Sequence, residues 1–150
     1  MTTFLLSVHV LAAILTIGPV AVAASLFPRY ARAQPEEPGE RTPPATAALL
    51  HRICRGYTIA GLSVPVFGVA TGAALGVLTD VWLLVSIVLT AIAAGILALA
   101  ILPGQERVLA GGEGTARTAA RLSGLTGIFN LLWAVVVVLM IARPGSTTGA

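Results

Sequence analysis

Four long apolar runs, separated by polar connections, constrain the fold of this chain most strongly. They cover Phe4–Phe27, Tyr57–Leu78, Val81–Leu102 and Leu122–Ala142. A helix needs about 20 apolar residues to cross the hydrocarbon core of a bilayer, whereas a spanning strand needs about ten alternating residues. Because these runs are longer than such a strand and do not alternate, they predict helices. We therefore expect an all-α integral membrane protein, a bundle of four transmembrane helices.

The composition agrees with a protein that is solvated partly by lipid. Of the 150 residues, 57% are hydrophobic and 10% are charged, whereas a soluble domain is typically about 25% charged. The length fits one membrane domain over residues 1–150. The arginines are not gathered on a soluble face, so we expect no nucleic-acid partner and take the lipid bilayer as the surroundings. The lone Cys54 excludes a disulfide within the chain.

The connections between the runs differ in character. Residues 28–42 are rich in proline and charge, which predicts a flexible, solvated loop. Thr42 followed by Pro43 is typical of a helix start, so the second helix is expected to extend into the cytoplasm from about residue 43. The other two connections are a tight turn at Leu78–Val81, in which Thr79 or Asp80 should cap the third helix, and the segment Pro103–Thr115.

The arginines predict the orientation. Eight of them flank the first and third connections, and only Arg143 lies on the other side. Cytoplasmic loops carry an excess of basic residues, so both termini should lie outside a bacterial inner (cytoplasmic) membrane. The first run lacks a basic segment before it and has arginines after it, so we expect a retained span and not a cleaved signal peptide.

Small residues recur at helical spacing in two of the runs. Spacings of three or four residues place such residues on one face of a helix, where another helix can approach closely. The two stripes should therefore pack against each other in a compact bundle, together with Ser86, Thr90 and Ala94 of the third run, and Pro65 should kink its helix. The stripe in the second run comprises Gly61, Pro65, Gly68, Gly72 and Gly76, and that in the fourth run comprises Ala120, Ser123, Gly127, Asn130 and Ala134.

Few polar side chains fall within the spans. Asn130 lies near the middle of the fourth run, and a buried amide needs hydrogen-bond partners. It could pair with Thr71, Ser63 or a freed backbone carbonyl, or it could contact a ligand or ion. A transport path would have to use the four intramembrane polar residues Asn130, Thr71, Thr90 and Ser123.

His9 is the most informative residue for function. It lies roughly 8 Å below the outer end of its span, level with Met140. A His9–Met140 pair would be a soft site for Cu(I) or an axial pair for haem, so haem and copper are the candidate cofactors and His9 the candidate metal ligand. The alternative is a neutral imidazole at the membrane interface, bonded to Ser7, Asp80, a carbonyl or water.

The second histidine lies near the opposite face of the membrane. His51 and His9 are separated by a core about 30 Å thick and cannot share one metal. We expect His51 to belong to a cytoplasmic basic rim that contacts anionic lipid headgroups, with an anion or a haem propionate as the alternative ligand. The rim comprises His51, Arg52, Arg55, Arg117 and Arg121. No catalytic constellation is recognisable, which favours a protein that is not an enzyme.

Three stretches carry a resemblance to known proteins. "LLSVHVLAAILTIGPVAV", "WLLVSIVLTAIAAGILALAILPGQERVL" and "VVVLMIARPG" resemble a family of small bacterial integral membrane proteins of unknown function. That family is distantly similar to the copper-resistance-D-like four-helix membrane proteins and, more distantly, to membrane protoporphyrinogen oxidases. The resemblance implies four helices in the inner membrane and, if the metal or haem analogy holds, assigns the ligand role to His9.

Together these observations predict a non-enzymatic accessory protein, or one that handles a small ligand or metal between its helices near His9. A haem- or copper-binding redox protein, a small dimeric transporter and a structural subunit of a larger membrane complex remain alternatives. The possible protein partners are thus a second copy of the chain or a larger complex.

Overall fold

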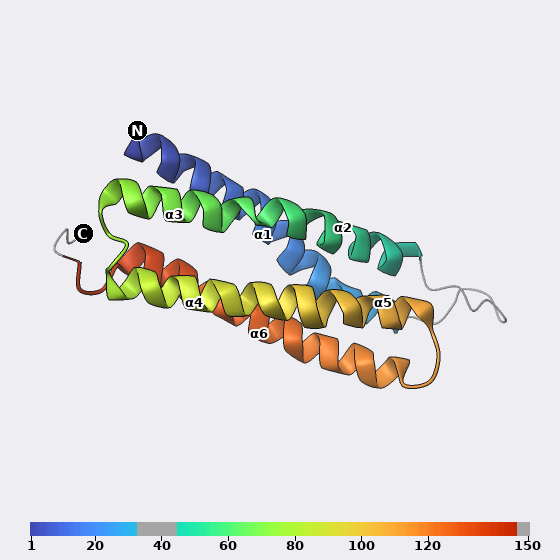
Figure 1. Ribbon diagram of the computed structural model, residues 1–150. Helices are drawn as coiled ribbons and strands as arrows, with labels where there is room; N and C mark the ends of the chain where they lie inside the picture. Colours follow the sequence, from blue (N-terminus) through green and yellow to red (C-terminus); the bar gives the residue numbers. More distant parts are fainter. Residues whose placement is uncertain (33–44, 147–150) are drawn as a thin grey trace.

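The computed structural model describes residues 1–32 and 45–146, and all the regular structure within them is helical. The elements are α1 (Thr2–Ala31), α2 (Ala45–Gly61), α3 (Ser63–Leu75), α4 (Val81–Ile96), the π-helical turn η1 (Leu97–Ile101), α5 (Leu102–Ala110) and α6 (Thr115–Ala142). α2 runs into α3, and α4 runs through η1 into α5. The described residues thus contain four helices long and apolar enough to cross a membrane, which confirms the expected all-α bundle (Figure 1).

Pro28 does not end the first helix, so the expected loop start at residue 28 is wrong. α1 continues through Pro19 and Pro28 to Ala31. Pro28 has no N–H and leaves the carbonyl of Ala24 without its usual helical donor. The hydroxyl of Thr126 in α6 donates to this carbonyl at 3.5 Å and supplies a substitute. The expected helix start at Thr42 and Pro43 lies outside the described residues.

Pro103 does not end its helix either, so the third connection is shorter than expected. The helix continues to Ala110, and α6 already begins at Thr115. In a regular α-helix the Pro103 ring would crowd the carbonyl of the residue four positions earlier. Here the preceding turn is π-helical, and the N–H of Leu102 donates to the carbonyl of Leu97. This wider turn changes the hydrogen-bond register just before the proline.

The predicted tight turn is present, and the helix that contains Pro65 is interrupted near the predicted kink. α2 and α3 are separated at Leu62, three positions before Pro65, where the Leu62 N–H donates to the carbonyl of Ile59 at 3.2 Å. α3 ends at Leu75, and the C-cap residue Gly76 has a left-handed φ of 71°, which suits glycine. Asp80 occupies the N-cap position of α4, but its side chain caps no backbone group. Its carboxylate accepts a hydrogen bond from the Trp82 indole N–H at 3.0 Å instead.

The two ends of the bundle are packed differently. α1 packs along α2 and α3, and α4 packs along α6, whereas α3 and α4 contact each other only sparsely (Figure 1). We call residues 1–14, 63–91 and 133–146 the open end, and the remaining described residues the closed end. All members of the main buried apolar cluster lie in the closed end: Val20, Ala23, Ala24, Phe27, Ala47, Leu50, Cys54, Ala93, Leu97, Ile101, Val108, Ala119, Leu122 and Phe129.

The two predicted stripes of small residues, in the second and fourth runs, do not pack against each other. A Cβ on Gly68 would lie 2.9 Å from His9 Cε1, and one on Gly72 would lie 2.9 Å from a Leu83 methyl group, so these glycines face α1 and α4. Gly61 lies next to Thr16 of α1, with 3.9 Å from its added Cβ to the hydroxyl.

The expected stripe on the fourth span is wrong. Gly127 has open space where a Cβ would be, and Ala120, Ser123 and Ala134 are exposed as well. α6 instead turns larger residues such as Phe129 inward. Pro65 is also exposed, and Gly76 ends a helix without packing against a neighbour.

Candidate functional site

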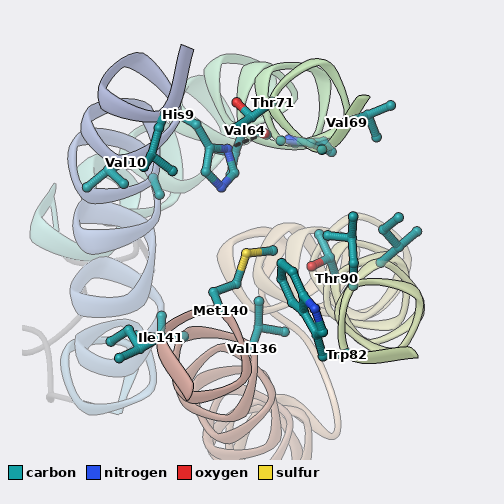
Figure 2. A pocket seen from close by; sticks show the side chains of 18 of the residues that line it. His9, Val10, Val64, Val69, Thr71, Trp82, Thr90, Val136, Met140 and Ile141 are labelled. Carbon is teal, nitrogen blue, oxygen red and sulfur yellow. Dashed lines mark hydrogen bonds between the residues drawn. The ribbon is translucent and has the colours of Figure 1, made fainter. Parts of the chain in front are cut away.

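A cavity of about 840 Å³ separates the two helix pairs at the open end. α1 and α3 form one wall, and α4 and α6 form the other (Figure 2). The lining is mainly aliphatic, and several of its residues, such as Val10, Val69 and Ile141, are also exposed on the outer surface of the bundle. The cavity therefore reaches the surface that faces lipid when the helices span a membrane.

His9 is held across the α1–α3 contact. Its Nδ1 lies 2.9 Å from the carbonyl oxygen of Val64. Because a carbonyl only accepts, Nδ1 carries the hydrogen in this bond. Gly68 permits the close approach, since the imidazole lies where a side chain at that position would begin. A backbone carbonyl was one of the expected partners of His9, whereas Asp80 bonds Trp82 and Ser7 bonds the carbonyl of Thr3.

The second ring nitrogen of His9 faces the cavity. Figure 2 shows the imidazole turned into the space between the helix pairs, opposite the Met140 sulfur. With Nδ1 protonated, Nε2 of the neutral ring is left with a lone pair. Among the described residues it has no hydrogen-bond partner. This nitrogen can therefore accept a hydrogen bond from a ligand or coordinate a metal.

Met140 lines the same cavity as His9, in agreement with the prediction that the two residues lie at the same depth in the membrane. It belongs to α6, and Trp82 of α4 lies beside it (Figure 2). A thioether and an imidazole are suitable axial ligands for haem and soft donors for Cu(I). Among the described residues, no group of three or more His, Cys, Asp or Glu side chains could hold a metal ion. The donor set thus fits a haem better than a bare cation, because two protein ligands suffice for a haem.

The four intramembrane polar residues do not form one path. Thr71 and Thr90 line the cavity, and the Thr71 hydroxyl donates to the carbonyl of Phe67 at 2.7 Å. Asn130 faces α1, where its amide nitrogen donates to the Ser25 hydroxyl at 3.1 Å. None of its expected partners is correct, because Asn130 lies next to α1 and away from α3. Ser123 is exposed on the outer surface.

Two buried polar atoms lack partners among the described residues: the Asn130 side-chain oxygen and the Trp133 indole nitrogen. Trp133 also lines the cavity and packs edge-to-face on Phe129, with ring centroids 6.3 Å apart. Sequence reasoning did not single out Trp133, because a tryptophan in an apolar run gives no signal that its N–H lacks a partner.

His51 is buried in the closed end, so its assignment to the basic rim is wrong. Only 8% of the residue is exposed. Its Nδ1 donates to the side-chain oxygen of Gln105 at 2.9 Å, and the Gln105 amide nitrogen lies 3.6 Å from the Cys54 sulfur. The other ring nitrogen is 3.8 Å from the Glu106 carboxylate. This network ties α2 to α5 at the opposite end of the bundle from His9.

The four arginines of the expected rim are exposed. The sequence did not predict that Gln105, which is 1% exposed, is a buried partner of His51. Gln105 follows Pro103, where the sequence predicts a connection and gives no sign that the helix continues.

The fold and the cavity define a class: an all-helical, multi-pass membrane protein with a ligand-sized space between its helices at one end. Within that class, comparison of the chain with family models, curated proteins and solved structures finds no match.

Proposed function

We propose that this protein is a non-enzymatic inner-membrane protein that binds a small lipophilic ligand in the cavity beside His9. The observation that carries the proposal is the lone pair of His9 Nε2, directed into a largely apolar space of about 840 Å³. Ligand sites usually have about 300–1,000 Å³ and combine an apolar lining with a few placed polar groups. Exposed lining residues give a lipid-dissolved molecule a lateral route to the site.

The test is to purify the protein in mild detergent and identify what it retains by native mass spectrometry, metal analysis and visible absorption. His9→Ala should reduce the retained ligand at least tenfold, because it removes the polar group at the cavity wall. Ser7→Ala is the matched control, since Ser7 is exposed on the same helix. Equal retention by the His9→Ala variant would reject a role for His9.

Haem is the second candidate, because His9 and Met140 line the same cavity. His9 Nε2 and the Met140 sulfur would hold the iron, and a haem bound there would supply one-electron redox chemistry. A Soret band that shifts in Met140→Leu and disappears in His9→Ala would support this candidate. A colourless protein that retains an organic ligand would reject haem and leave the first proposal intact. Stoichiometric copper without a Soret band would favour the copper alternative.

We further propose that the open end faces the outside of the inner membrane. The described arginines other than Arg143 lie in the closed end, and basic residues favour the cytoplasmic side. Thr79→Cys in the α3–α4 turn should react with a membrane-impermeant thiol reagent in intact spheroplasts. Glu113→Cys should react only after permeabilisation. The reverse pattern would invert this topology. A dimeric transporter and a structural subunit stay predictions of the sequence.

A further inference from the structure

Arg143 lies at the mouth of the cavity and has an unusual backbone conformation. It follows α6 with φ 41° and ψ 56°, and it is the one non-glycine residue with positive φ in the described part of the chain. A left-handed conformation is uncommon for a residue with a Cβ. The Arg143 backbone N–H donates to the carbonyl of Leu139 at 2.9 Å. A turn follows, in which the Ser146 N–H donates to the Arg143 carbonyl at 3.1 Å, and Arg143 lines the cavity.

The guanidinium is held in place but is only partly used. Nε donates to the carbonyl of Met140 at 3.4 Å, and the guanidinium carbon lies 5.8 Å from the centre of the Trp82 ring. Both contacts are with residues of the cavity wall. An arginine carries five N–H donors, and the remaining four have no partner among the described residues. Capping the end of α6 therefore accounts for only one donor of this side chain.

The positive charge of Arg143 has no ion-pair partner in the described residues. Their salt bridges include none to Arg143. Asp80 is the described carboxylate at this end of the bundle, and it accepts a hydrogen bond from Trp82 on the same indole that Arg143 covers. The cavity thus combines a long apolar interior with a guanidinium that forms no ion pair with a described residue.

We propose that the ligand of this cavity is a single-chain amphiphile with an anionic headgroup, and that Arg143 binds the headgroup. This inference rests on the proposed function and adds the chemical class of the ligand. The planar guanidinium matches carboxylate and phosphate oxygens, which it can bind with paired N–H donors. The apolar tail extends between the helix pairs toward His9 and Trp133. A fatty acid and a monoacyl phosphate share this chemistry.

The chain contains its own probe for this test. Its two tryptophans, Trp82 and Trp133, both line the cavity, so intrinsic fluorescence reports on the site. The protein would be reconstituted into nanodiscs of neutral lipid and titrated with three amphiphiles that share one brominated acyl tail. Their headgroups would be a carboxylate, a phosphate monoester and a neutral alcohol. Bromine quenches tryptophan on contact, so saturable quenching measures occupancy.

We expect the anionic probes to bind about tenfold more tightly than the alcohol, the factor that one charge-assisted hydrogen bond supplies. The better of the carboxylate and the phosphate identifies the headgroup. In Arg143→Gln the preference should fall to less than about twofold, while Arg143→Lys should retain part of it. Arg121→Gln, which removes an exposed arginine at the closed end, should behave like the unmodified protein.

The outcomes separate the two proposals. Saturable binding of all three probes with equal affinity would overturn the anionic class and leave a lipophilic site in place. Quenching that never saturates for any probe would overturn the proposed function itself. An anionic preference that survives unchanged in both Arg143 variants would show that another group binds the headgroup and would reject the role of Arg143.

Discussion

The position of the His9 imidazole depends on Gly68, because a glycine leaves room for the ring against α3. The imidazole packs on Gly68 and bonds the Val64 carbonyl one turn earlier in α3. The pairing could not be predicted from the sequence, because the register between two helices depends on how both of them pack. The sequence did predict that a backbone carbonyl could be the partner of His9.

Gly68→Ala should displace the imidazole of His9 and destabilise the protein. The added Cβ would lie 2.9 Å from His9 Cε1, so the imidazole must move and loses its bond to the Val64 carbonyl. Such overpacking costs about 1–3 kcal/mol, against roughly 1 kcal/mol gained because alanine favours helix. We expect a lower melting temperature in detergent, measured by tryptophan fluorescence, together with weaker ligand retention. Gly127→Ala is the control, because open space surrounds that position and alanine favours helix. Equal melting temperatures for the two variants would contradict the close contact.

The buried network around His51 makes a second prediction at this scale. Gln105→Leu removes the acceptor of the His51 Nδ1–H and leaves a buried donor without a partner. The free energy of unfolding should fall by about 1–3 kcal/mol. The double variant His51→Leu with Gln105→Leu should recover part of this loss. Strict additivity of the two single variants would show that they do not interact.

His51 illustrates why sequence neighbours mislead on a helix. Arg52, the next residue along the chain, is exposed and suggested an exposed rim. Successive residues on a helix are about 100° apart, so His51 can point into the bundle while Arg52 points away. Deciding between these faces requires the position of α5, where the sequence predicts a connection that begins at Pro103 instead of a helix.

Whole helices were predictable because apolar length alone determines which segments can span a bilayer. The ends of the helices were predicted less well, and both large errors fall at prolines. At Pro28 a hydroxyl from α6 replaces the missing donor, and at Pro103 a π-helical turn changes the register. Neither the Thr126 hydroxyl nor the π-helical turn can be predicted from the residue preferences around the proline, so a rule based on local propensity ends the helix there.

The Thr126 hydroxyl should contribute to the free energy of unfolding only when residue 28 is a proline. Thr126→Val removes the hydroxyl that donates to the Ala24 carbonyl, and the long 3.5 Å distance suggests a loss of roughly 0.5 kcal/mol. In a Pro28→Ala background the helix regains its own N–H at that position. There the same Thr126 substitution should be close to neutral. A loss of the same size in both backgrounds would contradict the proposed compensation.

The molecule as a whole is asymmetric along the bundle axis. The closed end contains the main buried apolar cluster, and the open end contains the cavity. Backbone amides in α3 and the first turns of α4 should therefore exchange with deuterium faster than those of α2 and α5 in detergent. Hydrogen exchange with mass spectrometry measures this difference, and bound ligand should reduce it. Uniform protection of the two ends would contradict it.

The divergence of the two helix pairs gives the protein unequal cross-sections at its two ends (Figure 1). A spanning protein of this shape acts as a wedge in the bilayer, since it displaces more area in one leaflet than in the other. The fit of the protein in the bilayer is then coupled to membrane curvature and to lateral pressure in the leaflet that surrounds the wide end.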